Sequence, residues 1–238
     1  MNIVITGGAS GLGRAITDRL VLDPNNKLLI SYSNSASVAE AMAAEHENLS
    51  VALCNFKEPE SVQAFCTTVK DFDVDILINN AFCGITTKHF HKMPKGTFLS
   101  SFQQSVVPTL EITQAMLSIC RKKKQGKIIT ILSSYLKGLP PIGLSEYVAN
   151  KAYLYSMHKS WVRENTKFNI LFYCLSPSFM QTPLNADVDE RILEGIKKAS
   201  PLNKILTVEE VAESILFLCN GSDHLNGINL YMNSGDSI

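Results

Sequence analysis

NIVITGGASGLG, residues 2–13, joins a short apolar run to a glycine-rich turn, and a helical pattern follows it. Asn2 to Thr6 predicts a buried strand, and Arg14 to Leu22 carries apolar residues at helical spacing. Glycines in such a turn let the backbone approach a pyrophosphate, whose charge meets the unpaired N–H groups and the dipole of the helix N-terminus. The stretch therefore predicts a phosphate-binding turn at the start of an α/β fold. The alternative is a loop whose glycines are incidental.

Short apolar strands alternate with longer helical patterns after this turn. Strands are predicted at residues 27–32, 51–54 and 75–78, and helices at residues 37–46 and 59–69. This alternation argues for a parallel sheet covered by helices on both faces, and right-handed crossovers give it the doubly wound form. Ligands collect at the carboxyl ends of such strands, where the glycine turn, Ser33, Asn55 and Asn80 all fall.

The composition is that of one α/β domain spanning residues 1–238. Hydrophobic residues make up 45% of the chain, and the 22 basic residues equal the 22 acidic ones, so the bulk charge indicates neither nucleic acid nor a membrane as partner. There is no apolar run of 18 or more residues and no basic leader before the first strand. Six scattered cysteines without a CxxC pair fit a reducing cytoplasm. His89 and His91 lack further ligands nearby, so no metal site is predicted.

SYLKGLPPIGLSEYVANK, residues 134–151, holds the candidate catalytic residues. Tyr147 and Lys151 are four apart, so in a helix starting at Glu146 they lie on one face. An ammonium beside a phenol lowers the phenol's pKa from about 10, and such a tyrosine could exchange a proton with a substrate alcohol or ketone. Ser134, after the apolar run 128–132, could hydrogen-bond the same oxygen. The alternative is an ordinary helix with a half-buried tyrosine and a solvated lysine.

Three motifs in this order resemble the short-chain dehydrogenase/reductase family. They are T-G-x-x-x-G-x-G from Thr6, N-N-A from Asn79 and S-x(12)-Y-x-x-x-K from Ser134. The resemblance covers essentially the whole chain and implies a single-domain Rossmann fold with a seven-stranded parallel sheet, a nicotinamide cofactor and hydride transfer. It further implies that Tyr147 exchanges the proton, that Lys151 binds the nicotinamide ribose and lowers the tyrosine's pKa, and that Ser134 orients the substrate oxygen.

The resemblance also implies which residues line the cofactor site. These are Gly7, Ser10, Gly11, Leu12, Gly13, Ser33, Asn34, Asn55, Phe56, Asn80, Ala81, Tyr147, Lys151, Met180 and Thr182. The second strand ends in SYSNS, residues 31–35, without a carboxylate that would repel a 2′-phosphate. We therefore expect NADPH rather than NADH, with Arg14 as the nearest basic residue. The alternative is that these residues only form a polar loop before the next helix.

Four positions depart from the pattern usual in this family. Ser105 stands where a helical asparagine usually holds a water of the proton relay, and Phe82 replaces a glycine beside the nicotinamide. Ser178 replaces a glycine after the sixth strand, and Asn55 replaces an aspartate near the adenine. These departures keep open a dinucleotide-binding subunit without catalysis, although the intact serine, tyrosine and lysine argue against it.

A mobile helical lid over the substrate is predicted at about residues 183–201, between Pro183 and Pro201. Its expected apolar inner face consists of Leu184, Val188, Ile192, Leu193 and Ile196. Members of the resembled family usually pair through helices predicted here at residues 102–120 and 146–164. Large side chains on the second helix, namely Tyr153, Tyr155, Met157 and Trp161, favour a homodimer or homotetramer.

The predicted function is reduction of a ketone by NADPH with Tyr147 as proton donor. The resemblance implies that reduction of a 3-oxoacyl thioester on a carrier protein is the commonest activity of such proteins. The expected substrate is therefore a small-molecule or carrier-bound carbonyl compound. Oxidation of an alcohol or sugar is the second enzymatic interpretation.

Overall fold

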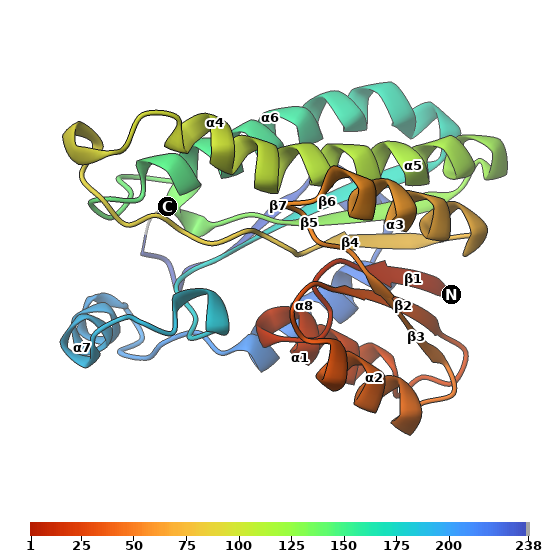
Figure 1. Ribbon diagram of the computed structural model, residues 1–238, viewed down its shortest axis with the longest axis horizontal. Helices are drawn as coiled ribbons and strands as arrows, with labels where there is room; N and C mark the ends of the chain where they lie inside the picture. The colour runs from red at the N-terminus through yellow and green to blue at the C-terminus, as the bar shows by residue number, and fades with distance from the viewer. Residues whose placement is uncertain (237–238) are drawn as a thin grey trace.

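Seven parallel strands form a single sheet in the computed structural model, which describes residues 1–236 (Figure 1). The strands are β1 (Asn2–Ile5), β2 (Lys27–Tyr32), β3 (Leu49–Leu53), β4 (Ile76–Asn79), β5 (Gly126–Ile131), β6 (Ile170–Pro177) and β7 (Asn229–Met232). Their order across the sheet is β3-β2-β1-β4-β5-β6-β7. The order reverses between β1 and β4, which creates the crevice where ligands of such folds bind. The predicted doubly wound, seven-stranded α/β domain is confirmed.

Helices cover both faces of the sheet (Figure 1). They are α1 (Gly11–Leu20), α2 (Ala36–Glu45), α3 (Pro59–Asp71), α4 (Thr97–Ser101), α5 (Val107–Lys123), α6 (Ser145–Asn165), α7 (Glu190–Ala199) and α8 (Val208–Asn220). Helices α1, α2 and α8 pack on one face, and α3, α5 and α6 pack on the other. Along β1, Ile3 and Ile5 belong to the first core and Val4 to the second, as the two-residue period of a strand requires.

The helix predicted at residues 102–120 has a different start. A π-helical turn, Phe102–Val106, precedes α5, which begins at Val107 and continues to Lys123. Pro108 has no N–H to donate to the carbonyl four residues earlier, so the regular helical ladder is interrupted there. The hydroxyl of Thr109 instead donates to the Ser105 carbonyl at 2.9 Å. The widened turn brings Ser105 into the interior.

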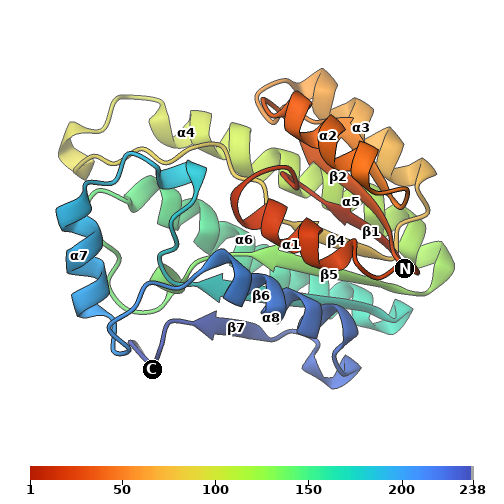
Figure 2. The same cartoon turned by 90° about the horizontal axis from the view of Figure 1, so that it is seen from below.

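The segment predicted as a lid is helical only in part. A 3₁₀ turn, Pro183–Asn185, is separated from α7, whose N-terminus is capped by Asp189 accepting from the Arg191 N–H at 2.8 Å. Within α7 no residue is buried, although Leu193 and Ile196 are half-covered. Figures 1 and 2 place α7 at the same end of the molecule as the loop between β4 and α4.

The outer face of α6 is less apolar than its sequence suggests. Trp161 is buried, with its ring 6.2 Å from that of Phe172, so it belongs to the core and not to an association face. Tyr155 and Met157 are half-buried, and Tyr153 is 41% exposed. Trp161 therefore does not contribute to the association surface that the sequence predicts on α6.

All six cysteines are free thiols, and Cys54, Cys120, Cys174 and Cys219 are buried. Among residues 1–236 there is no helix long and apolar enough to cross a membrane. The same residues contain no group of three or more His, Cys, Asp or Glu side chains that could hold a metal ion.

His158 makes stability depend on pH. Its imidazole is buried on α6 beside Phe172, and burial lowers its pKa from 6.5 to about 4, with the nearby backbone of Gly227 opposing the shift only in part. Between pH 6.5 and pH 4, His158 is protonated in the unfolded chain but neutral in the native protein. The free energy of unfolding should therefore fall as the pH falls from 6.5 toward 4. The loss should approach about 3 kcal/mol.

Urea unfolding at pH 8 and pH 5 measures this loss. His158→Phe should make the free energy of unfolding less dependent on pH, whereas His91→Gln, at an exposed loop position, should leave the dependence unchanged. An equal pH dependence in all three proteins would rule out the assignment to His158.

Candidate active site

The glycine turn lies at the carboxyl end of β1 and leads into α1. Gly7 and Gly11 have φ angles of +67° and +51°, which side chains rarely adopt. A methyl group on Gly13 would lie 2.0 Å from the Gly7 carbonyl oxygen, so only glycine fits there. Within the described residues no side chain caps α1, because the hydroxyl of Ser10 makes no capping hydrogen bond. The first N–H groups of α1 thus remain available to an anion, as a bound pyrophosphate requires.

Side chains from two neighbouring strands hold this turn in shape. The Ser31 hydroxyl accepts from the Gly7 N–H at 2.9 Å, and the Asn80 amide donates to the Thr6 carbonyl at 3.0 Å. The Thr6 hydroxyl in turn accepts from the Asn80 N–H at 2.9 Å. Asn80 therefore supports the turn, in line with its predicted place in the cofactor site. Ser31 and Thr6 were not among the predicted residues, although their polarity within apolar strands was a usable signal.

The predicted residues for the adenosine end lie on the rim of the crevice. Ser33 and Asn34 are exposed after β2. The Asn55 side chain accepts from the Lys57 N–H at 3.1 Å and donates to Glu58 at 2.7 Å.

Two other predicted neighbours of the adenosine end have partners within the protein. Phe56 is buried in the core, and Arg14 forms an ion pair with Asp18 at 2.6 Å. Arg14 is therefore already paired, and Ser33 and Asn34 are the exposed polar groups at the end of β2.

The loop after β6 passes against the glycine turn. A methyl group on Gly11 would meet Pro183 at 3.1 Å and Thr182 at 3.4 Å, which shows how closely the two segments approach. The Met180 carbonyl accepts from the Asn185 amide at 2.7 Å and fixes the loop that leads to α7. The predicted residues Thr182 and Met180 thus border the same crevice as Gly11 and the buried Leu12.

Tyr147 and Lys151 lie on one face of α6. The Lys151 ammonium donates to the Ile131 carbonyl at the end of β5, at 2.8 Å, and lies 5.7 Å from the centroid of the Tyr147 ring. Phe82 packs edge-on against Tyr147 with 5.2 Å between ring centroids, and its own face lies 4.6 Å from the Lys151 nitrogen. The structure thus brings together the predicted tyrosine and lysine.

The serine beside Tyr147 is Ser133. It is the N-cap of the 3₁₀ turn Ser134–Leu136 that follows β5, and its hydroxyl accepts from the Tyr135 N–H at 3.3 Å. The same hydroxyl hydrogen-bonds to Tyr147 and by itself lowers the pKa of the phenol. The assignment of Ser134 from its spacing to Tyr147 stays a prediction, and Ser133 is a second candidate beside it.

The pKa of Tyr147 is raised to about 12, mainly because burial disfavours the phenolate more than Ser133 stabilises it. Burial also lowers the pKa of Lys151 to about 7, so near neutral pH its ammonium is only partly charged. Burial thus sets the direction of the Tyr147 shift, and the lowering of the Tyr147 pKa by Lys151 stays a prediction. At neutral pH Tyr147 holds its proton and can act as an acid.

Ser105 lies inside the π-helical turn and is fully buried. Its hydroxyl accepts from the Cys83 N–H at 3.2 Å, which ties the loop after β4 to the start of α5. The residue that replaces the family's usual asparagine is thus engaged with the backbone next to Phe82.

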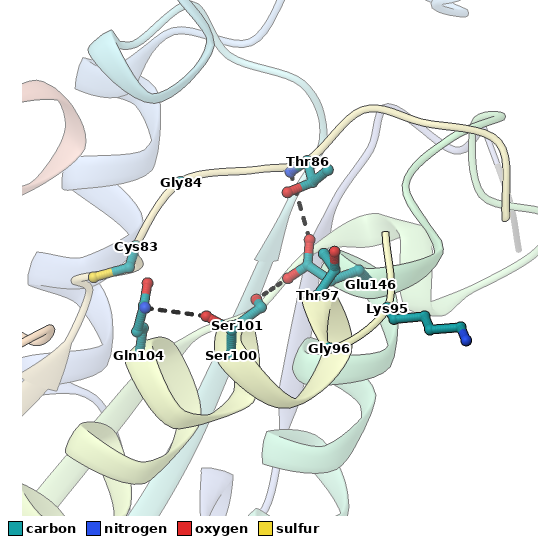
Figure 3. A pocket seen from close by; sticks show the side chains of 10 residues that line it. All are labelled: Cys83, Gly84, Thr86, Lys95, Gly96, Thr97, Ser100, Ser101, Gln104 and Glu146. Atoms are coloured by element: carbon teal, nitrogen blue, oxygen red, sulfur yellow. Dashed lines mark hydrogen bonds between the residues drawn. The ribbon is translucent and has the colours of Figure 1, made fainter. Parts of the chain in front are cut away.

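A cavity of about 440 Å³ opens between this loop, α4 and α6 (Figure 3). Its lining residues are Cys83, Gly84, Thr86, Lys95, Gly96, Thr97, Ser100, Ser101, Gln104 and Glu146. The buried Glu146 carboxylate accepts from the Ser101 hydroxyl, from the Asn150 amide at 3.2 Å and from the Thr86 N–H at 3.5 Å. Burial raises the pKa of Glu146 despite these donors. No pattern in the sequence indicated this buried acid next to Tyr147.

A protein-family model described as short chain dehydrogenase matches residues 1–192. The chain belongs to the short-chain dehydrogenase family. As a member it is an oxidoreductase, and the predicted resemblance is confirmed. The 3-oxoacyl-[acyl-carrier-protein] reductase FabG of Aquifex aeolicus (strain VF5) is 30% identical over 98% of this chain and 95% of its own length. The protein of the same name from Escherichia coli (strain K12) is 25% identical, with the same shares of the two chains covered.

Two solved structures share this fold. A short chain dehydrogenase/reductase family protein superposes with a TM-score of 0.85 at 25% identity and covers 99% of this chain and 96% of its own. YwfH, an NADPH dependent reductase involved in bacilysin biosynthesis, superposes with a TM-score of 0.86 at 21% identity over 99% of this chain and 97% of its own. At that identity the second likeness concerns the fold alone.

Proposed function

We propose that this protein reduces a ketone at the expense of NADPH, with Tyr147 as proton donor. The observation that carries the proposal is the contact of Tyr147 with Ser133 and Lys151 at the crevice that the glycine turn borders. A tyrosine that keeps its proton at neutral pH suits reduction, which consumes a proton at the carbonyl oxygen. Oxidation of an alcohol, the second interpretation, would use the same tyrosine as a phenolate base.

The residues around the crevice fit a dinucleotide. The uncapped N-terminus of α1 suits its pyrophosphate, and the end of β2, residues 31–35, carries no carboxylate to repel a 2′-phosphate. Lys151 would hold the nicotinamide ribose, and Thr182 would lie near the carboxamide. When bound, the cofactor supplies the hydride.

The protein's own residues would handle the substrate oxygen. Ser133, in the place we first assigned to Ser134, would donate a hydrogen bond to it, and Tyr147 would donate the proton as negative charge develops there. The buried Ser105 keeps the loop after β4 in position, through its bond to Cys83. Lys151 retains donors beyond the one given to Ile131 and would pass a replacement proton to Tyr147 through water.

A 3-oxoacyl thioester on a carrier protein is the substrate we favour. Two relatives named as 3-oxoacyl-[acyl-carrier-protein] reductases align over nearly the whole chain. The loop between β5 and α6 exposes apolar side chains, with Leu139 97% and Ile142 76% accessible, as contact with an acyl chain would require. We also propose that the protein associates as a dimer or tetramer through α5 and α6.

Oxidation of NADPH, followed at 340 nm with a panel of acetoacetyl thioesters, simple ketones and sugars, tests this function. We expect turnover with the ketones, fastest with the thioesters. Tight NADPH binding without turnover on any carbonyl compound would favour a non-catalytic dinucleotide-binding subunit.

Ser33→Asp should shift cofactor preference toward NADH. A carboxylate at this exposed position would repel the 2′-phosphate and accept hydrogen bonds from a free ribose, with an effect of about 1–3 kcal/mol on the ratio of the two dissociation constants. Calorimetric titration of both cofactors measures that ratio. Ser37→Asp, in the first turn of α2, is the control for added charge, and an unchanged ratio in Ser33→Asp would show that the phosphate binds elsewhere.

A further inference from the structure

Phe82 covers the two side chains on which the proposed chemistry depends. Its ring packs edge-on against Tyr147, and its face lies 4.6 Å from the Lys151 nitrogen. Lys151 is only 5% exposed. The segment that holds Phe82 directly follows β4, at the centre of the crevice.

One hydrogen bond and one aromatic contact occupy part of the Lys151 ammonium. An ammonium has three N–H donors, of which one goes to the Ile131 carbonyl at 2.8 Å, while the aromatic face of Phe82 covers another side. A ribose hydroxyl would have to come within about 3 Å of the same nitrogen to form a hydrogen bond. The family resemblance places residue 82 beside the nicotinamide, so a bound ribose would approach Lys151 from the side that the Phe82 ring covers.

We propose that Phe82 is a gate on the cofactor site, which caps Lys151 in the free protein and turns away when a nicotinamide dinucleotide binds. This inference rests on the proposed function, because it takes Lys151 as the residue that meets the ribose. Phe82 is a positioning residue in this account and takes no part in the chemistry.

The backbone on both sides of Phe82 is fixed, so the gate moves by rotation of the side chain. The Ala81 N–H donates to the Thr6 hydroxyl at 3.0 Å, and the Cys83 N–H donates to the Ser105 hydroxyl at 3.2 Å. Rotation about the Cα–Cβ bond of Phe82 would uncover Lys151 and Tyr147 and leave both hydrogen bonds intact. Ser105, which stands at the family's usual asparagine position, accepts the hydrogen bond from Cys83 and so helps to hold the loop that carries Phe82.

Closure of the gate should reduce apparent cofactor affinity, because only the open fraction of the protein binds. Phe82→Ala removes the ring and should tighten NADPH binding about tenfold if the open state is about one tenth populated. Phe82→Leu keeps a bulky side chain without an aromatic face, so its affinity for NADPH should lie between those of the wild type and Phe82→Ala. Phe90→Ala, an exposed position in the same loop, is the matched control.

Two measurements test the gate. Without cofactor, acetic anhydride should label Lys151 about tenfold faster in Phe82→Ala than in the wild type or Phe90→Ala, as read from peptide masses after brief exposure. With cofactor, stopped-flow fluorescence should show faster NADPH association in Phe82→Ala. Circular dichroism establishes that each variant is folded.

The outcomes separate the gate from the proposed function. Unchanged labelling together with unchanged NADPH association would overturn the gate alone, and so would weaker NADPH binding by Phe82→Ala, since the ring would then hold the cofactor. If neither the wild type nor any variant bound a nicotinamide dinucleotide, the proposed function and the gate would both be wrong. Faster labelling in that case would still show that Phe82 shields Lys151.

Discussion

Tyr147→Phe is expected to lower kcat for ketone reduction by about 10²- to 10⁴-fold. The substitution keeps the ring, so the edge-on packing against Phe82 should persist. It removes only the hydroxyl that meets Ser133 and would protonate the substrate oxygen. The dissociation constant for NADPH should change little, because the ribose is assigned to Lys151.

The measurement is steady-state NADPH oxidation with an acetoacetyl thioester, combined with calorimetric titration of NADPH. Tyr153→Phe is the matched control, because it removes a phenol from an exposed position on the same helix. Near-full activity in Tyr147→Phe would end the catalytic assignment. A parallel loss of NADPH binding would instead place the phenol among the cofactor contacts.

Ser133→Ala should lower kcat by about 10²- to 10³-fold, the usual effect of removing one hydrogen-bond donor from a developing oxyanion. The pKa of Tyr147 should also rise further, because the Ser133 hydrogen bond lowers it. The substitution removes one oxygen from a position beside the end of β5, and the sheet should be unaffected.

Ser134→Ala is the control that decides between the two serines. We expect it to retain activity within a few-fold of the wild type, because the hydroxyl beside Tyr147 belongs to Ser133. A large loss in Ser134→Ala with a small loss in Ser133→Ala would restore the assignment that spacing alone suggested. Comparing the two kcat values on one substrate is sufficient.

The fold could be predicted from the sequence because its signals are local and repeated. The strand at residues 27–32 was predicted at its observed bounds, since its apolar run ends abruptly at polar residues on both sides. The start of α5 was missed because Pro108 changes the hydrogen bonding of a segment whose apolar spacing still looks helical. The gap before α7 was missed for a similar reason, since the spacing of apolar residues continues through it.

The site was predictable in its residue types but less so in its contacts. Spacing identified Tyr147 and Lys151, yet a count of residues could not distinguish Ser133 from Ser134 in an irregular turn. The charge states depend on burial, which the sequence does not measure, and burial raises the pKa of Tyr147 and lowers that of Lys151. The sequence marks Phe82 as a departure from the family pattern, but only the packing shows that its ring covers Tyr147 and Lys151.

Transfer of deuterium from cofactor to product tests the central claim most directly. The protein is incubated with NADPH deuterated at C4 of the nicotinamide, on each face in turn, and with an acetoacetyl thioester, and the product is analysed by mass spectrometry. We predict a 3-hydroxyacyl thioester one mass unit heavier with one of the two cofactors, formed about 10²- to 10⁴-fold more slowly by Tyr147→Phe. Binding of the cofactor without a deuterated alcohol from any ketone of the panel would contradict it.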